Sequence, residues 1–274
     1  MIDRDLIKRA LAEDLQGGED ITSIATVSGT EKVAADFVAR KSGVLAGIDM
    51  ARAVLEEVGL TDIAVLVQDG TSVKAGTVLM TVRGDTRAIL LAERTALNFL
   101  GHLSGIATLT RTWVDAIAGT SCEIRDTRKT TPGMRLLEKY AVRMGGGRNH
   151  RMSLSDAALI KDNHIVAAGG VAEAFSQVRA KYPTSDIEIE VDTLEQLKEV
   201  LPLKPDLVLL DNMSPAQCSE AVSLVAGSTK LEASGGISLE SAKAYAATGV
   251  NYLAIGALTH SAPVFDIGLD LRAE

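Results

Sequence analysis

The stretch IEIEVDT at residues 187–193 joins a short apolar run to charged residues, and it sets the pattern for the second half of the chain. Five other stretches share this pattern: CEIRDT at 122–127, AALIKDN at 157–163, LVLLDN at 207–212, KLEASGG at 230–236 and YLAIGAL at 252–258. Segments with helical periodicity separate them, such as TLEQLKEVL and LESAKAYAATG. Strands that alternate with helices predict right-handed crossovers and a parallel sheet.

Polar residues follow each of these six predicted strands, and they bear on how the sheet is arranged. In a barrel the carboxyl ends of all strands meet on one face, where barrel enzymes hold their active sites. An open doubly wound sheet, which is the alternative, uses mainly its switch point. The pattern therefore favours a small or incomplete (β/α) barrel with its active site at the C-terminal strand ends. Charged residues inside apolar runs, such as Lys161 and Glu190, support a site there because burying an unpaired charge is costly.

The first hundred residues have a mixed α and β pattern, with a helical stretch at 3–15 and strands alternating with glycine turns up to residue 85. A helical pattern then starts at Ala88 and resumes after Gly105. We therefore expect two domains, with the hinge between them at about residues 88–118.

The composition excludes several classes of protein. The 46% apolar content of these 274 residues supplies large cores, so the chain is not disordered. A net charge of −8 and only 3% aromatic residues argue against nucleic acids and anionic membranes as partners. We find no apolar run as long as a membrane span and no signal-peptide pattern. Two distant cysteines, Cys122 and Cys218, suit a reducing compartment, so we expect a cytoplasmic protein.

Positive charge is concentrated between Arg125 and Lys161, where nine Lys and Arg residues outnumber three acidic residues and give a local net charge of +6. Arg135, Lys139 and Arg143 have helical i, i+4, i+8 spacing, so we place them on a solvated helix face or an interface. Five basic residues at predicted loops or strand ends are expected to converge on a polyanion, since arginine binds carboxylate or phosphate in bidentate fashion. They are Arg128, Lys129, His150, Arg151 and Lys161.

Glycines and carboxylates complete the predicted site. Ser234–Gly236 and Gly256–Ala257 follow the last two strands, where barrels commonly bind phosphate through backbone N–H groups. Glu190 and Asp211 are positioned to hold Mg²⁺ directly or through water, to bind sugar hydroxyls, or to stabilise an oxocarbenium-like centre. The structural alternatives are a loop-capping turn for Asp211 and an ion pair with Lys161 for Glu190. This set of groups indicates a substrate that carries both phosphates and carboxylates.

Several motifs together closely resemble the quinolinate phosphoribosyltransferase family, also called nicotinate-nucleotide pyrophosphorylase (carboxylating). They include RDTRKTTPG from residue 125, GGGRNHR from 145, LIKDNH from 159, EIEVDT from 188 and LEASGGIS from 231, and the resemblance spans nearly the whole chain. The resemblance implies an N-terminal α/β sandwich domain at residues 1–105 and an incomplete α/β barrel domain at residues 106–274, with the tail at 265–274 packing back on the first domain. It further implies a dimer or a multiple of dimers. It also implies that quinolinate and phosphoribosyl pyrophosphate (PRPP) react with Mg²⁺ to give nicotinate mononucleotide, pyrophosphate and CO₂ on the de novo route to NAD.

The resemblance also implies roles for individual residues. Arg94 in ERTALN would complete the neighbouring subunit's pocket. Thr127, Arg128, Lys129, His150, Arg151 and Lys161 would bind the quinolinate carboxylates and part of PRPP. Lys129, Lys161, Glu190 and Asp211 would act in catalysis, with Glu190 and Asp211 near the ribose and Mg²⁺. Ser234, Gly235, Gly236, Ile255, Gly256 and Ala257 would hold the 5′-phosphate. His102 and His164 also lie in family motifs, and we expect structural roles for them.

Three other functions are compatible with parts of this pattern. A related phosphoribosyltransferase, of the type encoded with molybdate-transport genes, would share the phosphate loops and act on another heterocycle. A lyase would form a Schiff base through Lys161 or Lys129. A non-enzymatic anion-binding module would have no reason to place Glu190 and Asp211 in the same pocket.

Overall fold

A computed structural model describes residues 2–272 of the chain. The chain forms two compact units. The first contains the residues up to Arg111, the segment Leu137–Gly146 and the residues from Ser261 onward; the second contains Thr112–Leu136 and Gly147–His260. The C-terminal segment therefore belongs with the N-terminal residues, and residues 273–274 of the predicted tail lie outside the described residues.

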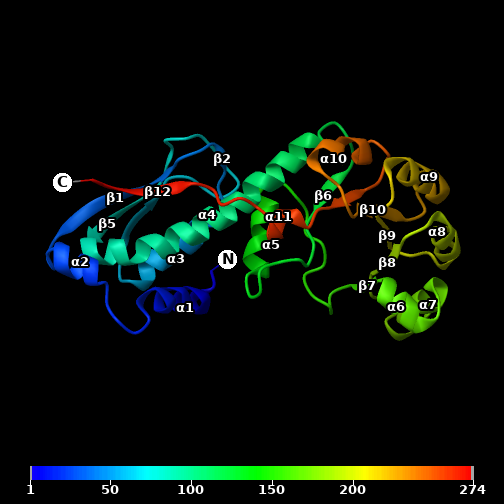
Figure 1. Ribbon diagram of the computed structural model, residues 1–274, viewed down its shortest axis with the longest axis horizontal. Helices are drawn as coiled ribbons and strands as arrows, with labels where there is room; N and C mark the ends of the chain where they lie inside the picture. Colours follow the sequence, from blue (N-terminus) through cyan, green and yellow to red (C-terminus); the bar gives the residue numbers. More distant parts are fainter. Residues whose placement is uncertain (1, 273–274) are drawn as a thin grey trace. The chain divides into compact units, whose positions relative to one another are not determined.

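The first unit is built around a four-stranded antiparallel sheet with the order β12-β1-β5-β3. Figure 1 shows β12, from the end of the chain, beside β1 from its beginning, and Ala39 pairs with Ile267 in that register. The elements are α1 (Arg4–Leu15), α2 (Ile21–Thr26), β1 (Lys32–Ala39), β2 (Gly43–Val44), α3 (Ile48–Glu57), β3 (Asp62–Val65), β4 (Ser72–Val73), β5 (Val78–Asp85) and β12 (Ile267–Arg272).

Helix α4 (Thr86–Ala116) runs for 31 residues without interruption, so the break that we expected at Gly105 is absent. Its glycines serve close packing instead. A Cβ at Gly105 would collide with the carbonyl of Pro263, and one at Gly101 would lie 2.9 Å from the carbonyl oxygen of Phe265. Glycine allows the returning chain to pass directly against the helix, and the packing gained there offsets its low helix propensity.

The second unit holds six parallel strands in the order β6-β11-β10-β9-β8-β7. Neighbouring strands follow one another along the chain from β7 to β11, and the first strand, β6, pairs with the last. This is the order of a barrel that is open between β6 and β7, whereas a doubly wound sheet reverses its order. The predicted fold class is therefore confirmed. The strands are β6 (Glu123–Arg125), β7 (Ala158–Ile160), β8 (Ile187–Val191), β9 (Leu207–Asp211), β10 (Lys230–Ser234) and β11 (Tyr252–Ala254).

Helices follow the strands and begin at polar caps. Thr193, Ser214 and Ser238 each accept a backbone N–H at the start of a helix and form a capping box, as these residue types predict. The remaining helices are α5 (Arg135–Met144), α6 (Asp162–Ala168), α7 (Val171–Lys181), α8 (Leu194–Val200), η1 (Leu201–Leu203), α9 (Pro215–Val225), α10 (Leu239–Ala246) and α11 (Ala257–His260). Among residues 2–272 we find no helix with the length and apolarity needed to cross a bilayer.

Helix α5 corrects one prediction about charged residues. Arg143 is exposed, but Lys139 is fully buried, so the two do not share a solvated face. Helix α5 also buries Leu137, Ala141 and Val142, and the buried arc extends around the helix to include Lys139. Spacing alone gives the direction of a side chain but not how much of the helix is covered.

Candidate active site

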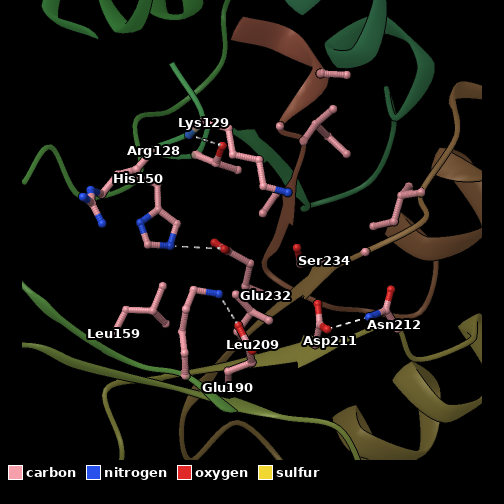
Figure 2. Close-up of a pocket in the computed structure, with 18 of the residues that line it drawn as sticks. Arg128, Lys129, His150, Leu159, Glu190, Leu209, Asp211, Asn212, Glu232 and Ser234 are labelled. Atoms are coloured by element: carbon pink, nitrogen blue, oxygen red, sulfur yellow. Dashed lines mark hydrogen bonds and ion pairs between the residues drawn. The ribbon is translucent and has the colours of Figure 1, made fainter. Parts of the chain in front are cut away.

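A cavity of about 750 Å³ opens at the carboxyl ends of the barrel strands in the second unit. Figure 2 shows side chains from several strands pointing into it, with Arg128 and His150 on one side and Asp211 and Asn212 on the other. Every predicted site residue except Arg94 lines this cavity: Thr127, Arg128, Lys129, His150, Arg151, Lys161, Glu190, Asp211, Ser234, Gly235, Gly236, Ile255, Gly256 and Ala257.

Arg94 lies elsewhere. It is exposed on α4 in the first unit and does not line the cavity of the second unit.

Two arginines define the cationic side of the cavity. The Nε of Arg128 is buried and has no hydrogen-bond partner within the described residues. Arg151 donates from Nη1 to the carbonyl of Ala157 at 3.0 Å. Burial, followed by repulsion from the nearby Arg128 guanidinium, lowers the pKa of Arg151. Two neighbouring guanidinium groups form a site that favours an anion with paired oxygens, such as a carboxylate.

Asp126 holds the loop that carries these groups, a role that the sequence analysis did not assign. This fully buried carboxylate accepts the backbone N–H of His150 at 2.7 Å and the side-chain amide of Asn149 at 2.5 Å. The backbone also connects the loop to β6, because Arg148 forms an isolated parallel bridge with Arg125. The loop after α5 thus continues the barrel wall beyond β6.

Two buried glutamates face His150, and the sequence analysis missed both of them. The Nε2 of His150 lies 2.9 Å from Glu188 Oε2 and 3.4 Å from Glu232 Oε1. Burial alone would lower the pKa of His150, but the two carboxylates attract its charged form and raise that pKa to about 9. Glu188 in turn has a raised pKa because it is buried and near Glu232. The available signal was the position of each glutamate inside an apolar strand.

The opposite side of the cavity carries the two predicted carboxylates. Glu190 Oε2 accepts from Lys161 Nζ at 2.5 Å, so the ion pair that was one interpretation of Glu190 is present. Burial and repulsion by Glu190 raise the pKa of Asp211. Asp211 also accepts from the side-chain amide of Asn212 at 2.6 Å.

Glycine is required in the turn after β10. Gly235 has φ +88°, and a Cβ there would collide with the side chain of Asn212. Gly256 is also confined, since a Cβ would lie 3.2 Å from both Lys129 Cδ and His260 Nε2. Both glycines bring bare backbone to the cavity, which suits phosphate binding by N–H groups. His260, at the end of α11, lines the same region although the sequence analysis did not select it.

Replacing Gly235 with alanine is expected to weaken the binding of a phosphate group at this turn by about tenfold or more, because the added Cβ forces apart the turn and Asn212. With PRPP as the substrate that the family resemblance implies, the effect is a raised KM for PRPP in steady-state kinetics with quinolinate held saturating. Gly227→Ala is the matched control, since Gly227 has φ +81° and no atom within 4 Å of the added Cβ. Equal KM values for the two variants would contradict the steric argument.

The other residues in the predicted motifs lie outside the cavity and make structural contacts. His102 bonds to the buried Glu138 at 2.8 Å, and His164 Nδ1 accepts the backbone N–H of Lys161 at 3.0 Å. Both cysteines are buried, and burial raises the pKa of Cys122 to about 12 and that of Cys218 to about 11. Neither thiol is set up as a nucleophile.

Known proteins resemble this chain over nearly its full length. The family description "Quinolinate phosphoribosyl transferase, N-terminal domain" matches residues 20–104, and "Quinolinate phosphoribosyl transferase, C-terminal domain" matches residues 106–270. The nicotinate-nucleotide pyrophosphorylase [carboxylating] of Mycobacterium leprae (strain TN) is 54% identical, with 98% of this chain and 96% of that protein covered. A protein of Bacillus subtilis (strain 168) named as probably the same enzyme is 41% identical, with 98% and 93% covered.

Solved structures agree with this resemblance. The crystal structure of nicotinate-nucleotide pyrophosphorylase from Ehrlichia chaffeensis superimposes with a TM-score of 0.94 at 38% identity and covers 98% of both chains. The corresponding structure from Francisella tularensis has a TM-score of 0.94 at 39% identity, with 98% and 95% covered. Both units, the strand order and the cavity at the strand ends therefore lead to one conclusion: the chain belongs to the quinolinate phosphoribosyltransferase family.

Proposed function

We propose that this protein transfers the phosphoribosyl group of PRPP to quinolinate and releases pyrophosphate and CO₂, forming nicotinate mononucleotide for NAD biosynthesis. The observation that carries the proposal is one cavity that joins two guanidinium groups, the carboxylates of Glu190 and Asp211, and two glycine-containing turns. Quinolinate supplies paired carboxylates and PRPP supplies phosphates, so the two substrates together match this set.

The geometry supports an orientation for each substrate. Arg128 and Arg151 receive the quinolinate carboxylates, while the side chains of Leu159 and Leu209, which also line the cavity, contact the aromatic ring. The turn at Gly235 and the turn at Gly256 receive the 5′-phosphate. Lys129 and Lys161 also line the cavity and would add positive charge near the pyrophosphate.

The bond changes follow from the substrates. The pyridine nitrogen forms a bond to ribose C1 as the bond from C1 to the pyrophosphate oxygen breaks. The ring nitrogen is then cationic, so the electron pair left at C2 when CO₂ departs is stabilised by the adjacent positive charge. A proton then joins C2. The protein supplies orientation and charge stabilisation, and the substrate supplies the electron sink.

The acidic side of the cavity fits Mg²⁺, which prefers carboxylate oxygens and substrate phosphates. Glu190 and Asp211 would hold it directly or through water, and the presence of both carboxylates in the lining of the same cavity supports this fit. When bound, the ion would neutralise charge on the pyrophosphate. Lys161, which bonds to Glu190 at 2.5 Å, would keep that carboxylate oriented.

In this proposal Arg94 completes the cavity of a neighbouring subunit in a homodimer or a multiple of dimers, as the family resemblance implies. Its exposure on α4 and its absence from the cavity of its own chain are compatible with that role. The two reduced, buried cysteines suit a cytoplasmic enzyme.

Incubation of the pure protein with PRPP, Mg²⁺ and either quinolinate or nicotinate tests the proposal. Nicotinate mononucleotide and CO₂ from quinolinate only is the expected result. Turnover of nicotinate alone would retain the phosphate site but overturn the substrate assignment, and no turnover of either would reject the proposed function.

The related heterocycle transferase is not favoured by the curated relatives, which are named as carboxylating enzymes. A Schiff base at Lys161 is disfavoured because its amine is held in an ion pair.

A further inference from the structure

Glu232 occupies a central place in the cavity that its position in the sequence does not explain. Its side chain is fully buried on β10, and it lines the cavity between His150 and Asp211 (Figure 2). One carboxylate oxygen, Oε2, accepts from Arg125 Nη1 at 2.6 Å. The other, Oε1, has no hydrogen-bond partner among the described residues and lies 3.4 Å from His150 Nε2.

Arg125 holds the Glu232 carboxylate in place through a hydrogen bond. Its guanidinium carbon lies 4.5 Å from the centre of the Tyr252 ring, and its side chain is only 15% exposed. Strands β6, β11 and β10 are consecutive in the sheet, so Arg125, Tyr252 and Glu232 are held by adjacent strands. An arginine held on a ring and bonded to a buried carboxylate has little freedom to move.

His150 connects Glu232 to Arg151, the arginine proposed to bind the substrate. Its Nδ1 accepts the backbone N–H of Arg151 at 2.7 Å, and its Nε2 faces Glu188 and Glu232. Both ring nitrogens therefore have partners within the protein, so the ring does not need a substrate contact to be held in place. A change at Glu232 would shift the imidazole and, through it, the backbone of Arg151.

Arg125, Glu232, His150 and Glu188 also form a cluster of paired polar and charged groups. The Arg125 cation pairs with Glu232, and the Nε2 of His150 faces both Glu232 and Glu188. Buried carboxylates that lack such partners would be costly. The negative charge of Glu232, which lines the cavity, opposes the binding of a dianion. Attraction of the substrate therefore does not explain why this carboxylate is there.

We propose that Glu232 is a positioning residue for the quinolinate side of the cavity, acting through His150 on Arg151. This inference rests on the proposed function. A role through the charge of Glu232 and a role through the position of its side chain predict opposite changes in quinolinate binding. If Glu232 mattered only through its charge, removing that charge would strengthen the binding of quinolinate. If it positions His150 and Arg151, removing it weakens that binding and leaves the phosphate side unchanged.

Steady-state kinetics of Glu232→Gln test the proposal, with each substrate varied in turn. The KM for quinolinate is expected to rise by about tenfold or more, while the KM for PRPP stays within about twofold of the wild type. An unchanged or lower KM for quinolinate would overturn the proposal, and so would an equal rise in both KM values, which indicates general loss of structure. A wild-type protein that does not turn over quinolinate would instead reject the proposed function.

Glu123→Gln is the matched control. Glu123 lies on β6 in register with Tyr252, as Glu232 does on β10, and it also pairs with an arginine, Arg148, but outside the cavity. Its KM values should match the wild type. The ¹⁵N resonances of the His150 ring give a readout without turnover: they should shift in Glu232→Gln and stay constant in Glu123→Gln, and constant resonances in both would contradict the proposed contact.

A double variant covers the case in which Glu232→Gln does not fold. Glu232→Gln leaves the Arg125 cation without its partner, whereas adding Arg125→Gln removes both charges and avoids an uncompensated buried cation. The double variant should fold and still show the raised KM for quinolinate. A wild-type KM in this folded protein would refute the positioning role.

Discussion

Replacement of Arg151 by alanine is expected to lower kcat/KM for quinolinate by about 10²–10³-fold, because a charge-assisted contact to the substrate carboxylate is lost in a partly desolvated cavity. The guanidinium stands beside Arg128, and burial together with that neighbour lowers its pKa. The site therefore holds two positive charges close together until an anion binds. Kinetics with quinolinate as the varied substrate would measure the loss, and the melting temperature would show that the fold persists.

Arg148→Ala provides the control for this experiment. Arg148 lies three residues earlier on the same loop, but its side chain is 67% exposed and pairs with Glu123. Its removal should change kcat/KM by less than about threefold, since exposed ion pairs contribute little. A comparable loss in both variants would mean that the loop, rather than the Arg151 side chain, carries the effect, and near-normal turnover of Arg151→Ala would refute its assignment.

Replacement of Glu190 by glutamine is expected to lower kcat by about 10²-fold or more while the protein remains folded. The change removes one of the two carboxylates proposed for Mg²⁺ and frees Lys161, whose side chain is 47% exposed and therefore remains hydrated. We also expect the Mg²⁺ concentration for half-maximal rate to rise. Rate measurements over a Mg²⁺ titration would show both effects.

Asp192→Asn is the control for Glu190→Gln. Asp192 follows the same strand two residues later, but it is exposed and does not line the cavity. Its Mg²⁺ dependence should match that of the wild type. An unchanged Mg²⁺ titration in Glu190→Gln would remove Glu190 from the proposed metal site, whatever happens to the rate.

The strands and their order illustrate how far local pattern carries a prediction. Each of the six predicted parallel strands is present, because short apolar runs between helical segments have few other ways to bury their side chains. The same reasoning placed a break at Gly105, which the continuous helix α4 contradicts. Periodicity reflects only the packing of a residue's own segment. Glycine is needed at position 105 because the backbone of Pro263 passes directly against the helix there.

The functional residues also fall into a group that the sequence revealed and a group that it did not. Polar residues at strand ends were visible in the sequence because parallel strands bring those ends to one face. The predicted site residues other than Arg94, which lies on α4, line one cavity. The supporting residues were not visible. Asp126 holds His150 through its backbone, and Glu188 and Glu232 surround the ring from β8 and β10. These contacts join residues from different strands, and no spacing along the chain encodes them.

The sequence by itself determined the alternation of strands and helices, the location of the site at the strand ends and the chemical types that meet there. These properties depend on local periodicity and on the residues that each strand carries to its end. Only the tertiary structure decided the pairing of β12 with β1, the burial of Lys139 and the Arg125–Glu232–His150 arrangement. The physical reason is that burial and pairing of charges depend on neighbours from distant parts of the chain, and the fold selects those neighbours.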